Sequence, residues 1–161
     1  MNACFRSLAA ALAVGAAVAC EAAPLQVEAF DAQAWQAIQA SARKATAVVF
    51  TATDCAYCPA VLQRLADEIR QRKLDAALVA VVMDVAPGQD DARLLDDPHH
   101  RDVDRVLAFS GQGVALRHAV NPAWRGVTPY VVFLAKGAAP KWVTGPPSPQ
   151  AVNEWAAAAA Q

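Results

Sequence analysis

The sequence has no excess of charge of either sign. Its 161 residues include 14 Lys and Arg against 15 Asp and Glu, a formal net charge of −1 at pH 7. Nucleic acids and anionic lipids attract strongly basic surfaces, so we expect neither as a partner. Only 18% of the residues are charged and 56% are hydrophobic. This composition excludes a disordered chain and fits one globular domain.

Long apolar runs are also missing. The run over residues 8–18 follows Arg6 and carries no charge, but it is shorter than the about 20 residues that a transmembrane helix needs. Ala17 and Ala19, at its end, form an A-x-A cleavage pattern. A basic start, a short apolar run and small residues are typical of a secretory signal peptide, which we place at residues 1–22.

This signal peptide leaves a mature domain over residues 23–161, outside the cytosol. The alternative is a lipoprotein signal that ends before Cys20, with Cys20 as the lipidated first residue of the mature chain. Such signals usually carry Leu at the position that Ala17 occupies here. We therefore favour a leader that is discarded together with Cys20.

Cysteine is scarce in the mature domain. Of the 4 cysteines, Cys4 and Cys20 fall in the predicted signal peptide, which leaves Cys55 and Cys58. One pair cannot form the several disulfides that hold a small secreted scaffold together. A domain of this length can also bury a sufficient core without disulfides. A single close pair therefore points to chemistry rather than to stabilisation.

The mature sequence alternates strands with helices. Short apolar, β-branched stretches predict strands, and apolar residues at helical spacing predict helices. The expected strands cover residues 25–30, 45–51, 76–83, 130–134 and 141–144, and the expected helices run from N-cap Asp31 to Lys44, from the cysteine pair to Lys73, over 103–111 and from N-cap Ser148 onward. This order predicts a single-domain α/β fold with a mixed central sheet flanked by helices.

The segment Cys55-Ala56-Tyr57-Cys58 lies between a predicted strand and a predicted helix. Unpaired backbone N–H groups and the macrodipole at a helix N-terminus stabilise an anion, so we expect a lowered pKa for the Cys55 thiol. A thiolate near neutral pH attacks disulfides and is a good leaving group. We therefore predict Cys55 as the nucleophile and Cys58, further along the helix and more buried, as the resolving thiol.

The neighbours of this CxxC pair argue against several other uses. Structural zinc takes four N or S ligands, and the sequence has no second CxxC. Haem attachment needs a histidine where Pro59 stands. We expect no resident metal or cofactor, although a soft metal carried by the two thiolates stays open. An acidic loop is expected over 84–98, and a solvated surface is favoured over a metal site for Asp90, Asp91, Asp96, Asp97, His99 and His100.

A second motif, Gly126-Val-Thr-Pro129, directly precedes the strand predicted at 130–134. With Phe50-Thr-Ala-Thr-Asp-Cys55-Ala-Tyr-Cys58, it makes residues 25–160 resemble the thioredoxin superfamily. The resemblance implies a thioredoxin fold in which Pro129 follows a cis peptide bond and faces the CxxC disulfide. It also implies that Thr128 offers backbone groups to an extended substrate, so that Thr128 and Pro129 form a docking platform by strand addition.

Within the superfamily, the chain is similar to periplasmic Dsb proteins of the disulfide isomerase branch, through Ala56-Tyr57 and through Thr128 before Pro129. This similarity implies an exported, periplasmic thiol–disulfide oxidoreductase that acts on protein thiols and disulfides. It places Ala56 and Tyr57 in contact with the substrate. It also implies a membrane-bound redox partner, and we expect a monomer.

Three residues depart from the related patterns. Thioredoxins carry a buried acid where this chain has Val49, Pro59 follows the second cysteine, and Asp54 places a negative charge beside Cys55. The sequence leaves the direction of electron flow open among oxidase, reductase and isomerase. It also leaves open a thioredoxin-like metallochaperone and a reductase dedicated to one maturation partner.

Overall fold

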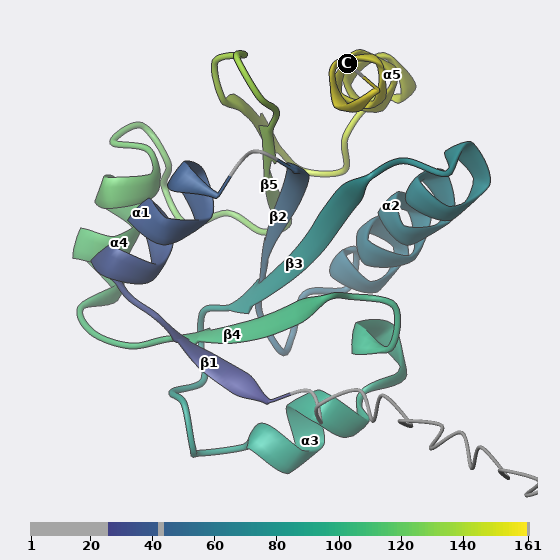
Figure 1. Ribbon diagram of the computed structural model, residues 1–161. Coiled ribbons are helices and arrows are strands. Elements are labelled where there is room, and N and C mark those ends of the chain that lie inside the picture. Colours follow the sequence, from purple (N-terminus) through teal and green to yellow (C-terminus); the bar gives the residue numbers. More distant parts are fainter. Residues whose placement is uncertain (1–25, 42–43, 161) are drawn as a thin grey trace, which may run out of the picture.

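Six strands form one mixed sheet in the computed structural model, which describes residues 26–41 and 44–160 (Figure 1). The predicted signal peptide, including Cys4 and Cys20, lies outside the described residues. The elements are β1 (Val27–Phe30), α1 (Ala32–Ala40), β2 (Ala45–Thr51), α2 (Cys58–Arg72), β3 (Ala76–Val82), α3 (Asp91–Asp96), the 3-10 helix η1 (Pro98–His100), β4 (Arg105–Phe109), α4 (Gly113–Val120), β5 (Tyr130–Leu134), β6 (Lys141–Thr144) and α5 (Pro149–Ala159).

The strand order is β1-β4-β3-β2-β5-β6. The first four strands of this order are parallel to one another, whereas β5 runs antiparallel to both β2 and β6. Every residue of β2 is buried, as expected for a strand with neighbours on both sides and helices on both faces. The predicted α/β fold with a mixed sheet is confirmed.

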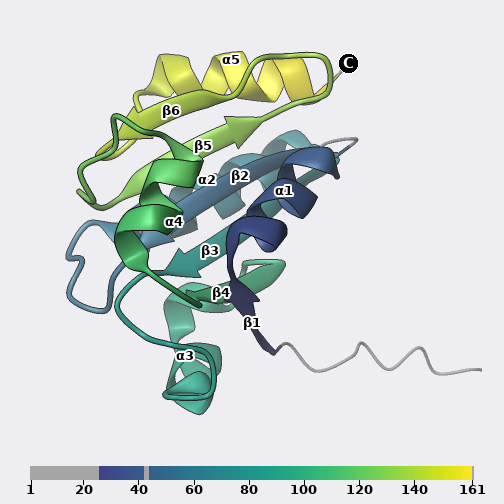
Figure 2. The same cartoon turned by 90° about the vertical axis from the view of Figure 1, so that its left-hand side faces the viewer.

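Helices cover both faces of the sheet (Figures 1 and 2). Alternate residues of β2 face opposite layers because the side chains of a strand alternate. Val48 and Phe50 pack in one apolar cluster with residues of α1 and α4, and Ala47 and Val49 pack in another with residues of α2 and α5. The two clusters give the domain a three-layer arrangement with β2 and β3 at its centre.

Helix starts follow local side-chain chemistry. The Asp31 carboxylate accepts a hydrogen bond of 2.7 Å from the N–H of Ala34 at the start of α1. At the start of α5, the Ser148 hydroxyl accepts one of 3.1 Å from the N–H of Ala151. Both N-caps were predicted, since Asp and Ser satisfy N–H groups that a first helical turn leaves unpaired.

One predicted helix is wrong. Residues 103–111 were expected to be helical, but Arg105–Phe109 is the parallel strand β4. Val106, Leu107 and Phe109 fit a helical stripe, yet all of Val106–Phe109 is buried, on both faces of the sheet. A short apolar run is compatible with a helix or a strand. Here the pairing with β1 and β3 makes it a strand.

Three helices were not predicted. The segment 84–98, expected as an acidic loop, contains α3, and η1 begins at its end. Helix α4 begins at Gly113, two residues after the Gly111 that was expected to end a helix. The new strand and helix make β4 and α4 a further strand–helix unit, which places β4 between β1 and β3.

A charged pair fastens the edge strand. The Arg105 guanidinium donates two hydrogen bonds, of 2.7 and 2.6 Å, to the Glu28 carboxylate, which joins β4 to β1. These hydrogen bonds lower the pKa of Glu28 and raise that of Arg105. Both side chains are about one-third exposed, so solvent screens the pair and its contribution to stability is modest.

Candidate active site

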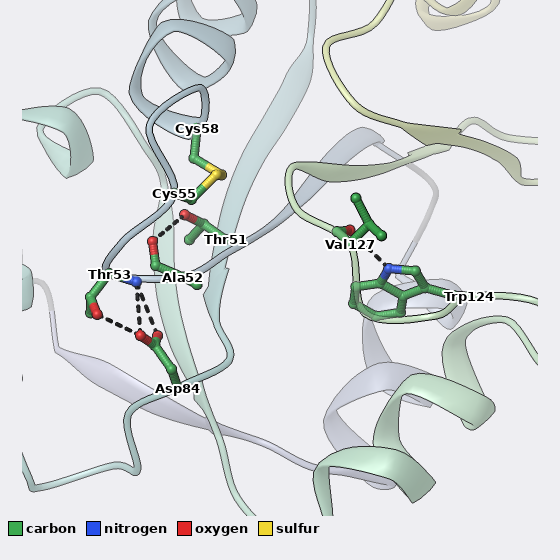
Figure 3. Close-up of a disulfide and its surroundings, with 8 residues drawn as sticks. All are labelled: Thr51, Ala52, Thr53, Cys55, Cys58, Asp84, Trp124 and Val127. Carbon is green, nitrogen blue, oxygen red and sulfur yellow. Dashed lines mark hydrogen bonds between the residues drawn. A yellow bond between two sulfur atoms is a disulfide. The ribbon is translucent and has the colours of Figure 1, made fainter.

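Cys55 and Cys58 form a disulfide at the carboxyl end of β2 (Figure 3). Their Cα atoms lie 5.5 Å apart. The two sulfurs differ in access, because Cys58 is only 1% exposed whereas Cys55 is partly exposed. The pair therefore presents one cysteine to the outside and keeps the other in the protein.

The loop between β2 and α2 positions this pair. The N–H of Cys55 donates to the carbonyl of Ala52 at 3.1 Å, and the N–H of Cys58 donates to the carbonyl of Cys55 at 3.2 Å. The helix begins at Cys58, so Cys55 precedes it by one turn of this loop. Pro59 fits in the first helical turn, where an N–H would have no partner in the helix.

A hydrogen-bonded clamp holds the start of the same loop (Figure 3). The Asp84 carboxylate, just beyond β3, accepts bonds of 3.1 and 3.0 Å from the N–H of Thr53 and another from its hydroxyl. These bonds tie the residues before Cys55 to the neighbouring strand. This contact could not be predicted from the sequence, because the two residues lie far apart in the chain.

The second motif lies at the same edge of the sheet. Phe50 pairs with Tyr130 in the antiparallel register of β2 and β5, which brings the residues before β5 beside the end of β2. The peptide bond between Thr128 and Pro129 is cis. Pro129 is buried and Thr128 is partly exposed.

Glycine and backbone contacts shape this second loop. Gly126 has a φ of 85°, a conformation that residues with a Cβ rarely adopt. The carbonyl of Pro129 accepts a 2.8 Å bond from the N–H of Gly145, beyond β6. This bond ties the end of the loop to the segment that follows β6.

Trp124 anchors the loop from below. Its indole Nε1 donates a 3.0 Å hydrogen bond to the carbonyl of Val127, directly before Thr128 (Figure 3). The indole stacks on Tyr130 with 4.3 Å between ring centroids and is only 6% exposed. Trp124 therefore packs in the core and also orients the loop.

The phenol of Tyr130 is a polar group in this apolar layer. Burial raises its pKa, and a 2.8 Å hydrogen bond from the side-chain amide of Asn121 offsets only part of the effect. Tyr130 therefore stays neutral near neutral pH and serves as a stacking platform for Trp124.

Trp124→Phe is expected to loosen this loop, because it keeps an aromatic ring but removes the donor to Val127. The net loss of one hydrogen bond is about 1 kcal/mol, which corresponds to about fivefold faster amide hydrogen exchange in residues 125–128 if local opening limits exchange. Trp35→Phe is the matched control, since Trp35 packs in the same cluster from α1. Equal exchange in the loop of both variants would contradict the anchoring role.

The exposed face of the site carries the residues between the cysteines. Tyr57 is 69% exposed and Ala56 is also exposed, so both are free to contact another molecule. The structure thus brings the predicted residues Cys55, Ala56 and Tyr57 to the edge of the sheet that also carries Thr128 and Pro129.

Behind the disulfide lies a cavity of about 250 Å³ that the sequence did not predict. The cavity is lined by residues of the segment α3–η1 together with both cysteines. His100 is one of them and is buried. The sign available in the sequence was the adjacent pair His99-His100 in a chain with 3 histidines.

Within residues 26–41 and 44–160, no group of three or more His, Cys, Asp or Glu is arranged to hold a metal ion.

A mixed sheet with a disulfide-bonded CxxC after β2, and a cis-proline before β5, defines a protein with the thioredoxin fold. A thiol:disulfide interchange protein of the thioredoxin family from Chlorobium tepidum TLS has the same fold, with a TM-score of 0.55 and 15% identity over 88% of this chain and 100% of that chain.

Two mycobacterial structures are similar as well. The secreted Mycobacterium tuberculosis disulfide oxidoreductase homologous to E. coli DsbE has a TM-score of 0.50 and 17% identity, over 75% of this chain and 84% of that chain. DsbF from the same organism has a TM-score of 0.51 and 11% identity, over 74% and 84%. No protein-family model matches the chain, and no curated protein matches it in sequence. The structural matches confirm the predicted resemblance to thioredoxin-like proteins at the level of the fold.

Proposed function

We propose that this chain is an exported thiol–disulfide oxidoreductase that exchanges disulfides with protein substrates through Cys55-Ala56-Tyr57-Cys58. The observation that carries the proposal is the unequal exposure of the two bonded cysteines. Cys58 is 1% exposed and Cys55 is partly exposed, so an incoming protein reaches one sulfur and not the other. A purely structural disulfide has no need of an accessible sulfur.

The exchange takes two steps. In the reduced protein, the Cys55 thiolate attacks one sulfur of a substrate disulfide, the substrate S–S bond breaks, and the second substrate sulfur leaves as a thiol. The Cys58 thiolate then attacks the Cys55 sulfur, which expels the first substrate sulfur and restores the Cys55–Cys58 disulfide. Two electrons pass from the protein to the substrate, and the reverse sequence oxidises a substrate dithiol.

Docking of the substrate is assigned to the loop before β5. Thr128 is partly exposed and precedes the strand that pairs with the end of β2, so its backbone would be able to pair with an extended chain, as in strand addition. Pro129 cannot donate a backbone hydrogen bond, and its buried ring fixes the place of Thr128. Ala56 and Tyr57 are exposed between the two cysteines and would contact the bound chain.

Export to the periplasm, a monomeric state and a membrane-bound redox partner belong to the same proposal. The signal-peptide pattern of residues 1–22 supports export, and one similar structure is that of a secreted oxidoreductase. Across the described part of the chain, no helix combines the length and apolar character needed to cross a bilayer.

The test is an equilibrium titration of the Cys55–Cys58 pair in glutathione buffers, with thiol alkylation and mass spectrometry as the readout. A potential near about −120 mV would identify a strong oxidant, and one near about −270 mV a reductant that needs a transmembrane electron donor. Either value supports exchange chemistry and sets its direction. A pair that does not cycle between dithiol and disulfide contradicts the proposal.

A further inference from the structure

The cavity behind the disulfide brings a buried histidine to the two cysteines. Its volume is about 250 Å³, and it extends from Cys55 and Cys58 to η1, which packs against α2. A space of this size has room for several waters, and its polar lining offers them partners. A proton can therefore pass through water between groups that line the cavity without direct contact between them.

His100 has one ring nitrogen fixed and the other free. Its Nδ1 lies 2.7 Å from the carbonyl oxygen of Leu94, and a carbonyl can only accept, so Nδ1 carries the proton. Nε2 is then the acceptor of the neutral ring. Nε2 has no hydrogen-bond partner among the described residues. Every side-chain nitrogen or oxygen there that solvent cannot reach does have a partner, so Nε2 is accessible to water.

Cys58 needs such an acceptor. The resolving step requires a thiolate, and burial in apolar surroundings raises the pKa of a thiol. Cys58 is 1% exposed. The adjoining strand β2 offers no ionisable side chain, since its residues are Ala, Val, Phe and Thr. Besides the cysteines, the strands and helix around the cavity contribute only residues without an ionisable side chain: Thr51 from β2, Pro59 and Leu62 from α2, and Val82 from β3.

Three other charged or titratable groups face the cavity, all from α3–η1. Arg93 cannot accept a proton, and it forms a 2.9 Å ion pair with Asp90. The Asp97 carboxylate accepts a 2.9 Å hydrogen bond from the N–H of His99 at the start of η1. The His99 side chain is exposed. His100 alone among the four is a buried base with a free lone pair.

We propose that His100 accepts the Cys58 proton through cavity water when the mixed disulfide is resolved, which makes His100 a positioning residue for the exchange. The Cys58 thiolate attacks the Cys55 sulfur, the substrate thiolate leaves and is protonated, and His100 returns its proton to water. This inference rests on the proposed oxidoreductase function.

The test follows single turnovers of the reduced protein with oxidised glutathione. Acid quenching and mass spectrometry count the protein–glutathione mixed disulfide and the intramolecular disulfide at each time. The measurement is repeated from about pH 6 to about pH 10, a range that spans the pKa of a free thiol, about 8.5. His100→Asn is the informative variant, because its amide can still donate to the Leu94 carbonyl but cannot take a proton. His118→Gln, on α4 and exposed, is the matched control.

His100→Asn is expected to slow conversion of the mixed disulfide at pH 7 by about 10- to 100-fold, with formation of the mixed disulfide within about twofold of wild type. The defect should shrink as pH rises past about 8.5, because the thiol then ionises without a base. His100→Gln repeats the test should the Asn variant unfold. A wild-type rate, a defect of equal size at every pH, or the same pH-dependent defect from His99→Gln instead would each overturn the role of His100.

The same experiment distinguishes failure of the proposed oxidoreductase function from failure of the role of His100. If the wild-type protein forms no mixed disulfide, the oxidoreductase function itself is lost. If the wild type completes both steps and His100→Asn does so equally fast, only the role of His100 is lost.

Discussion

Cys55→Ser is expected to abolish disulfide exchange with a protein substrate, lowering the rate by about 10³-fold or more, as removal of a nucleophile does in other covalent mechanisms. The serine hydroxyl stays protonated near neutral pH, and Cys58 is too buried to take over the attack. The measurement is reduction of a protein disulfide by the pre-reduced variant, with free thiols counted over time.

Cys58→Ser is the matched variant, because it removes the other half of the same disulfide. It is expected to keep the first attack and to lose resolution, so the mixed disulfide with the substrate accumulates and is visible as a covalent adduct on a non-reducing gel. The adduct should disappear in the double variant. Full turnover by Cys55→Ser, or adducts formed equally well through Cys58, would contradict the assignment of nucleophile and resolving thiol.

The two sides of the site could be predicted because each has a local sequence pattern. Cys55-Ala56-Tyr57-Cys58 lies between a β-branched strand and an amphipathic helix, and the strand of Tyr130–Leu134 follows Pro129 directly. The two patterns meet at one edge of the sheet because β5 runs antiparallel to β2, which puts the amino end of β5 beside the carboxyl end of β2. The exposure of Tyr57 in the loop and the burial of Cys58 at the start of α2 follow from the same strand–loop–helix pattern.

The back of the site could not be predicted, because it depends on tertiary contacts. Val103–Phe109 has the spacing of a helical stripe, but a place between β1 and β3 makes most of it a strand buried on both faces. The segment that precedes this strand places η1 against α2, and His100 lines the cavity behind Cys58. Nothing in the local sequence of His100 indicates a neighbour in α2.

The docking loop also depends on the core beneath it. Phe50 is fully buried on the face of the sheet that α1 and α4 cover. Its ring centroid lies 4.8 Å from that of Trp124 and 5.3 Å from that of Phe30. Trp124 in turn holds the carbonyl of Val127. Phe50 therefore supports both the strand core and the loop that carries Thr128.

Phe50→Ala is expected to lower the free energy of unfolding by about 3–5 kcal/mol, a large share of the about 5–15 kcal/mol that stabilises a typical domain. Urea denaturation followed by circular dichroism measures this loss. A variant within about 1 kcal/mol of wild type would show that the aromatic cluster is not a central support of the fold.

Phe133→Ala separates support of the fold from support of the loop. Phe133 is 3% exposed and packs on Trp155 of α5, on the opposite face of the sheet, with 5.1 Å between ring centroids. Truncation there should cost a similar free energy, but it leaves Trp124 and its bond to Val127 intact. Under conditions where both variants stay folded, only Phe50→Ala should speed hydrogen exchange in residues 125–128 and weaken binding of a substrate peptide. Both truncations should therefore destabilise the fold to a similar extent, but only Phe50→Ala should impair substrate docking, because of these two rings only Phe50 packs against Trp124.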